Sequence, residues 1–220
     1  NLYSEDPNLA CKKCYENFIN LTNDLKEVGI NTNCAPILDI NFRDTHEVIK
    51  CRTLGQNANQ IADLARIVAN AHIDNGLFPI IKHIPGHGRA LSDSHLELPR
   101  VNVSLEELQK TDFLPFRELS DLKFAMTAHI LYSAIDDQNP ATMSKKMLDI
   151  IRYDIGFKNI IMTDDLSMKA LKGSFTQKTK KSLEAGCDLI LHCNGNMKEM
   201  MEINDSLSYC DDKLLNCLHN

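Results

Sequence analysis

The chain has 220 residues, a hydrophobic share of 43% and a formal net charge of -6 at pH 7. This size is enough for one globular domain with a sizeable core. Phosphate binding needs clustered Lys and Arg, so an acidic chain without a basic run is not expected to bind nucleic acid. No apolar run approaches the roughly 20 residues of a membrane span, and the first residues lack the basic and apolar regions of a signal peptide. We therefore expect a cytoplasmic protein without a membrane partner.

The eight cysteines are scattered along a chain that is too long to depend on a disulfide framework. We expect reduced thiols. Cys11 and Cys14 form a C-x-x-C pair, but no second pair with zinc-ligand spacing follows, and no strand precedes it as in a thioredoxin-like motif. This pair is therefore interpreted as structural.

In the first half of the chain, short apolar runs alternate with longer amphipathic segments. The pattern predicts a helix over Cys14 to Val28, a strand over Asn33 to Ile40, a helix over Asn57 to Asn75 and a strand over Leu77 to His83.

The second half continues the alternation. It predicts a helix over Leu105 to Leu119, for which Ser104 and Glu107 offer a capping box. The remaining elements are a strand over Phe124 to His129, a helix over Met147 to Tyr153, and strands over Ile160 to Thr163 and Asp188 to His192.

Strands alternating with helices indicate an α/β fold built of βα units around a parallel sheet, and we expect a single domain over residues 1–220. A closed (β/α)8 barrel has eight strands and typically about 250 residues. The five predicted strands fall short of that number, and the first recognisable element is a helix that leads into a strand. We therefore expect a TIM-barrel-like domain that lacks its first one or two βα units, before Asn1.

In such sheets the reactive groups collect at the carboxyl ends of the strands, because the βα loops converge there. The predicted strand ends are polar: Asp39, Lys82, His83, His129, Asp164, Asp165, His192 and Asn194.

The densest cluster of chemistry lies between Lys82 and His95. Its Pro and Gly residues exclude a regular helix, so His83 and His87 are not a ligand pair on one helical face. Asp93 and His95 can pair within the loop, and an imidazole held by a carboxylate can exchange protons near neutral pH. An exposed loop with incidental histidines would produce the same pattern.

A second cluster follows the strand at Ile160, where two acids lie at its end. A carboxylate in this position can attack an anomeric carbon. The other acid can cap a helix that we expect to begin near Leu166. We assign catalysis to Asp164 and capping to Asp165.

In this order and spacing, the motifs resemble those of the bacterial β-N-acetylhexosaminidases of glycoside hydrolase family 3. The similarity runs from about Leu25 to Asn194. Its motifs are Ala35 to Asp39, Arg52-x-x-Gly55, Lys82 to Gly88, Asp93-Ser94-His95, Met126 to His129 and Thr163 to Met168.

The resemblance implies a retaining glycosidase that needs neither cofactor nor metal. Asp164 would be the nucleophile and His95 the acid/base, oriented by Asp93, whereas Arg52, Lys82 and His83 would bind the sugar hydroxyls. The implied substrate is a small carbohydrate, the terminal β-1,4-linked N-acetylglucosamine of anhydro-muropeptides in bacterial peptidoglycan recycling. Asp39 would support the pocket floor. Nothing in these patterns predicts an oligomeric state.

One family feature is absent. Family members carry an acidic-Gly-Gly-Arg segment on an earlier strand, which adds an Asp and an Arg to the sugar pocket, and this sequence has no such segment. Its loss would weaken substrate binding and leave a barrel edge unpaired.

Three alternatives remain. The first is a β-glucosidase of the same family, although those enzymes generally recruit a Glu from a second domain. The second is a metal-dependent hydrolase that uses His83, His87, Asp93 and His95 as ligands. The third is a non-catalytic remnant that still folds or binds sugar.

Overall fold

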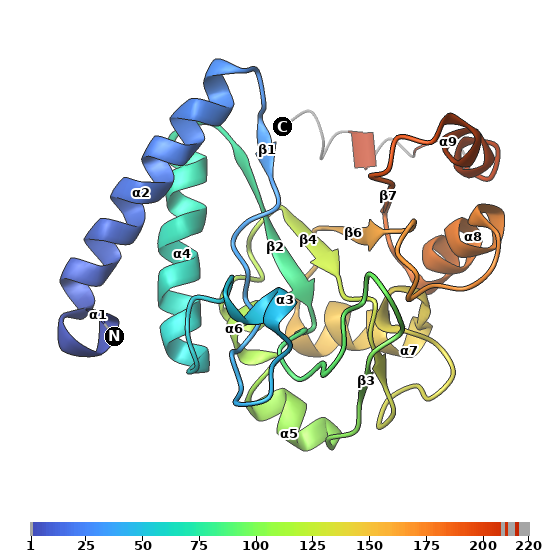
Figure 1. Cartoon of the computed structure of the whole chain (residues 1–220), viewed down its shortest axis with the longest axis horizontal. Coiled ribbons are helices and arrows are strands. Elements are labelled where there is room, and N and C mark those ends of the chain that lie inside the picture. Colours follow the sequence, from blue (N-terminus) through green and yellow to red (C-terminus); the bar gives the residue numbers. More distant parts are fainter. Residues whose placement is uncertain (1, 208–209, 211–213, 216–220) are drawn as a thin grey trace.

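The computed structural model describes residues 2–207, 210 and 214–215 and contains one five-stranded parallel sheet (Figure 1). Its strands lie in the order β1 (Thr32–Asn33), β2 (Phe78–Ile84), β4 (Phe124–Thr127), β6 (Ile160–Asp165) and β7 (Leu189–Leu191). Each strand therefore pairs with the next one along the chain, and every pairing is parallel. A doubly wound sheet reverses its order, whereas a barrel does not. The sheet is part of a barrel, as expected.

The helices cover the outer side of this sheet. Helix α2 (Pro7–Glu27) packs beside α4 (Ala58–Asp74) at one end of the molecule, and α8 (Phe175–Ala185) and α9 (Met197–Asn204) lie at the other (Figure 1). The shorter helical segments are α1 (Leu2–Glu5), α3 (Glu47–Lys50), α5 (Leu105–Lys110), α6 (Leu114–Glu118), a 3-10 turn (Ala141–Met143), α7 (Lys145–Ile150) and a π turn (Ile151–Ile155).

Alternation along the strands separates two cores. Ile81, Ala125 and Ile161 belong to the large core under the helices, whereas Ile80, Met126 and Ile160 belong to a smaller cluster on the opposite face. That face corresponds to the barrel interior. Because side chains alternate along a strand, Lys82 on β2 and Asp164 on β6 share the interior face with Ile80 and Ile160. The register shifts between Lys82 and Ile84, and such irregularities re-aim side chains at strand ends.

Two predicted elements differ from the structure around prolines. The strand expected over Asn33 to Ile40 is regular only at Thr32–Asn33, and Ile37 then forms a single bridge to Lys82. Pro36 lacks an N–H and cannot donate to a ladder. The helix expected over Leu105 to Leu119 is divided into α5 and α6, with Pro115 in the first turn of α6.

The prediction of a helix beginning near Leu166 was wrong. Residues 166–170 form turns, and the next helix is α8, which Ser174 caps. Strand β6 is longer than expected and includes Asp164 and Asp165. The structure also adds a two-stranded parallel sheet of β3 (Arg100–Val101) and β5 (Leu131–Tyr132). Strands of two residues are too short to produce a periodic signal.

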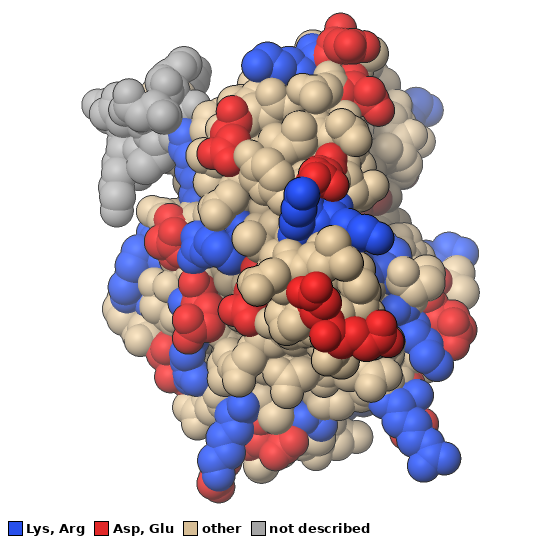
Figure 2. Space-filling view, turned by 90° about the vertical axis from the view of Figure 1, so that its left-hand side faces the viewer, with Lys and Arg blue, Asp and Glu red and all other residues tan. Residues whose placement is uncertain are grey.

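No helix of the described residues is long and apolar enough to cross a membrane. On the face that α1 and α2 present to the viewer, acidic and basic side chains are interspersed among uncharged ones (Figure 2).

Candidate active site

Asp164 lies on the interior face at the end of β6. Its Oδ1 accepts the backbone N–H of Asp165 at 2.8 Å. Burial would raise the pKa of Asp164, but the nearby His83, His129 and Lys82 and the Asp165 N–H outweigh burial and hold it below its usual range. The carboxylate is therefore ionised at neutral pH, which is the form that a nucleophile needs.

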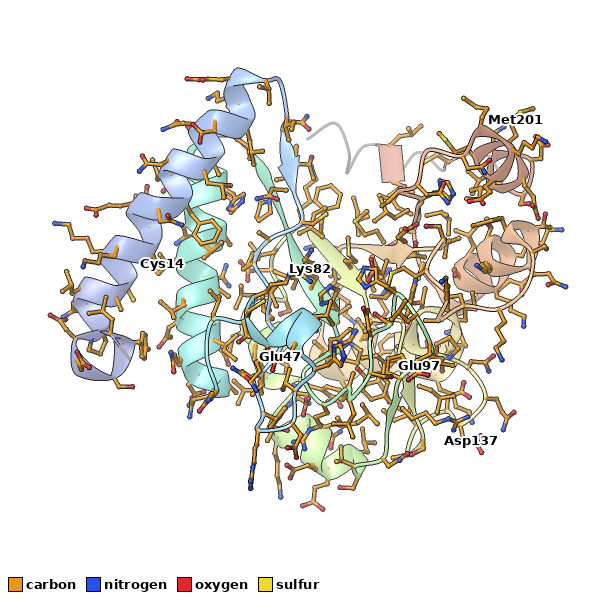
Figure 3. All side chains as sticks on the ribbon, viewed as in Figure 1. Cys14, Glu47, Lys82, Glu97, Asp137 and Met201 are labelled. Carbon is orange, nitrogen blue, oxygen red and sulfur yellow. The ribbon has the colours of Figure 1, made fainter. Side chains whose placement is uncertain are left out.

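Lys82 approaches this carboxylate from β2 and lies near the middle of the molecule (Figure 3). Burial lowers its pKa, and the positive charge of Arg52 lowers it further, while Asp164 opposes the shift. Arg52 itself lies on an exposed turn after α3 and donates to the carbonyl of Val48 at 3.4 Å. Lys82 is therefore near both Asp164 and Arg52, which places one buried cation beside the candidate nucleophile and a second cation beside the first.

Asp39 fixes the end of β2. It is fully buried, and its Oδ2 lies 2.6 Å from Nδ1 of His83. Its Oδ1 accepts the backbone N–H groups of His83 and His87 at 3.2 and 2.6 Å. Burial raises the pKa of Asp39, but His83 and His87 lower it by more, so the carboxylate stays ionised. A ring held through Nδ1 keeps its Nε2 for a ligand.

The predicted pairing of Asp93 with His95 is present. His95 Nδ1 and the His95 backbone N–H lie 2.7 and 2.9 Å from Asp93 Oδ1. Burial would raise the pKa of Asp93, but these contacts with His95 lower it overall. The charged Asp93 thus fixes the His95 ring and leaves its Nε2 for a substrate, as an acid/base residue requires. The carbonyl of His95 accepts the N–H of Lys169, which connects this loop to the turn after β6.

Two buried residues near the site, His129 and Thr142, had no assigned role in the sequence interpretation. His129 is fully buried, with Nδ1 2.7 Å from Thr142 Oγ1 and Nε2 3.1 Å from the carbonyl of Asp165. The polarity of the strand end pointed to His129, whereas nothing in the sequence pointed to Thr142. Asp165 accepts the N–H groups of Ser167 and Cys193 instead of capping a helix.

The structure does not assemble the ligands of the metal-dependent alternative. Among the described residues, no three His, Cys, Asp or Glu side chains are grouped so that they could hold an ion. Nδ1 of His83 and of His95 each contacts a carboxylate, and Nε2 of His87 contacts Ser94. Cys11 and Cys14 are free and lie on α2. Cys14 is at the edge of the molecule (Figure 3).

A parallel partial barrel with an ionised carboxylate, a lysine and a carboxylate-paired histidine at its strand ends has the features of a glycosidase barrel. The family comparison agrees with this class. The model of the glycosyl hydrolase family 3 N-terminal domain matches residues 10–214, and the chain belongs to this family.

Individual relatives are hexosaminidases. A beta-hexosaminidase of Tolumonas auensis is 40% identical over 171 residues, which are 75% of this chain and 50% of that protein. Native NagZ of Neisseria gonorrhoeae superimposes with a TM-score of 0.90 at 32% identity, over 99% of this chain and 64% of NagZ. Its complex with N-trifluoroacetyl-D-glucosamine gives 0.89 at 31% identity, over 99% and 64%. The chain spans about half the length of the curated relatives it matches.

Proposed function

We propose that this chain is the catalytic barrel of a retaining β-N-acetylhexosaminidase. The observation that carries the proposal is the ionised Asp164 beside Lys82 and His83, together with the Asp93–His95 pair in a loop bonded to the turn after Asp164. Hexosaminidase relatives and a NagZ structure that holds an N-acylated glucosamine analogue support the same sugar class.

In the proposed mechanism, Asp164 attacks the anomeric carbon, the glycosidic C–O bond breaks, and protonated His95 gives its proton to the leaving oxygen. Water then attacks the covalent intermediate while neutral His95 accepts the water's proton, and Asp164 is released. A histidine acid does not repel the nucleophile as a second carboxylate would, so Asp164 can remain ionised. Arg52, Lys82 and His83 hold the sugar hydroxyls.

The finer assignment is the terminal β-1,4-linked N-acetylglucosamine of anhydro-muropeptides in the bacterial cytoplasm. It rests on the family resemblance and on the N-acylated ligand of NagZ. These 220 residues do not include the acidic-Gly-Gly-Arg segment through which, by the family resemblance, two further polar contacts reach the sugar pocket, so this assignment concerns the contacts of the present residues alone.

The test is hydrolysis of p-nitrophenyl N-acetyl-β-D-glucosaminide, with the β-glucoside as a comparison and EDTA present throughout. Release from the acetamido sugar alone, lost in Asp164→Asn, supports the proposal. Equal rates on both sugars contradict the sugar class, and activity that EDTA abolishes contradicts metal-free chemistry. Saturable binding of N-acetylglucosamine without hydrolysis would favour a non-catalytic sugar-binding domain.

A further inference from the structure

The Asp93–His95 loop is attached to the rest of the molecule through its middle residue. Ser94 is 3% exposed, whereas the side chain of His95 is 59% exposed. The carbonyls of Ser94 and His95 accept the N–H groups of Ala170 and Lys169 at 3.2 Å each, on one side of the loop. On the other side, Ser94 Oγ lies 3.1 Å from Nε2 of His87. Ser94 therefore joins the loop to the end of β2.

His87 stands on a rigid support. Its backbone N–H donates to the buried Asp39, and the carbonyls of Gly86 and Gly88 accept the hydroxyls of Tyr132 and Thr45. At Gly88 an added Cβ would lie 1.9 Å from the carbonyl oxygen of Ile40. The backbone at Gly88 therefore packs directly against the backbone at Ile40. The backbone of His87 is thus fixed at the residue itself and on both sides of it.

The chemistry of His87 does not fit a proton carrier for the sugar. The ring is 1% exposed, and burial, reinforced by the charge of His83, lowers its pKa to about 4. Near neutral pH it is uncharged. Its Nδ1 is buried without a partner among the described residues, so Ser94 is the hydrogen-bond partner of the ring.

We propose that Ser94 and His87 are positioning residues whose hydrogen bond holds the Asp93–His95 pair in place relative to Asp164. His87 is fixed just after β2, and its hydrogen bond to Ser94 holds the loop in one position. The exposed His95 ring, next to Ser94 in that loop, is thereby held in one position as well. Neither residue touches the substrate. The kinetic part of this inference rests on the proposed function, whereas its structural part does not.

The test variant is Ser94→Ala, which removes the hydroxyl and leaves the backbone attachments. Ser92→Ala is the matched control, because Ser92 lies in the same loop and its side chain has no hydrogen bond among the described residues. Kinetically, Ser94→Ala should lower kcat/KM for an N-acetylglucosamine disaccharide about tenfold or more, because misplaced acid/base groups lose catalytic power. It should leave kcat/KM for the dinitrophenyl glycoside, whose leaving group needs no proton, within about twofold.

A double variant separates the bond from the individual residues. If both residues act through their shared hydrogen bond, the double variant Ser94→Ala/His87→Gln should lose little more kcat/KM than His87→Gln alone. Losses that multiply would overturn the coupling.

Amide hydrogen exchange tests the same bond without turnover. Loss of the bond should speed exchange at the Lys169 and Ala170 amides, which donate to the loop, while the Ile161 amide in β6 should not change. If the chain hydrolyses no hexosaminide, the proposed function fails and exchange alone decides the positioning role. Exchange in Ser94→Ala that matches Ser92→Ala would overturn the inference, and so would an equal kinetic loss on both substrates.

Discussion

His95 differs from the other candidate catalytic groups in its exposure. Its side chain is 59% exposed, against 20% for its partner Asp93. An exposed ring that is held at one nitrogen can contact a leaving group without contributing to sugar binding. In this arrangement, sugar binding depends on the buried groups around Asp164. The acid and the nucleophile should therefore respond differently to substitution.

His95→Ala should lower kcat/KM on a disaccharide by roughly 10²-fold or more, because general acid catalysis contributes about that much. Aryl glycosides with acidic phenols should lose far less, because their departure needs little protonation. Asp164→Asn serves as the comparison and should lose activity on both substrates. The measurement is kcat/KM across a series of leaving groups, and equal losses from His95→Ala at both ends of the series would refute the acid assignment.

His87 links this site to the acid stability of the fold. Its folded pKa is about 4 against an ordinary value of 6.5, so the unfolded chain binds a proton that the native chain does not between these values. The unfolding free energy therefore rises with pH in this window. The contribution of His87 is fully present above about pH 6.5 and is lost as the pH falls toward 4. The difference corresponds to about 3 kcal/mol.

His87→Gln should reduce the slope of unfolding free energy against pH between 4 and 6.5 by about one proton. His72 and His129 also have lowered pKa values through burial, so a residual slope should remain in the variant. Urea unfolding at a series of pH values measures this directly. A slope that the substitution leaves unchanged would show that the pKa of His87 is not lowered in the native protein.

At the scale of elements, the site depends on the close contact between the loop after β2, at Gly88, and the segment that follows β1, at Ile40. Gly88→Ala would drive a Cβ to within 1.9 Å of the backbone oxygen of Ile40, which cannot move without shifting the backbone next to Asp39. We expect a loss of about 1–3 kcal/mol in unfolding free energy, as for other overpacked sites. At Gly55 an added Cβ meets only the flexible side chain of Gln60, so Gly55→Ala is the control. Thermal unfolding of both variants gives the comparison, and equal melting temperatures would contradict the argument.

The elements also show what the sequence could predict. Strands β2, β4 and β6 were predicted because each is a continuous buried run with a helix after it. The local pair Asp93–His95 followed from a spacing of two residues. Pairs without a local spacing were not accessible: the fold of the connection after β4 brings His129 to Thr142, and the packing of the segment after β1 beside β2 brings Asp39 to His87. The helix near Leu166 was wrong because the Asp165 carboxylate bonds Ser167 and Cys193, which a capping pattern cannot reveal.

For the whole molecule, the open sheet is the main structural question. Strands β1 and β7 each pair on one side only within the described residues. Met162, Leu189 and Leu191 are only partly buried on the interior face. In a closed barrel such positions are covered by further strands, and unpaired edges are prone to association.

Adding an acidic-Gly-Gly-Arg strand to these 220 residues should therefore raise activity through substrate binding. A segment of a full-length family member that carries the acidic-Gly-Gly-Arg strand, fused before Asn1, would pair an edge and add two polar groups to the sugar pocket. We expect KM for p-nitrophenyl N-acetyl-β-D-glucosaminide to fall by about tenfold or more, because each hydrogen bond to a charged group contributes about 1.5–3 kcal/mol. In a matched control fusion, the acidic residue and the Arg of that segment are both changed to Ala. This control should pair the same sheet edge without adding the two polar contacts to the sugar pocket. Improvement in that control equal to the intact fusion would assign the gain to barrel closure, and no improvement in either would show that the sugar pocket of this chain does not depend on the added strand.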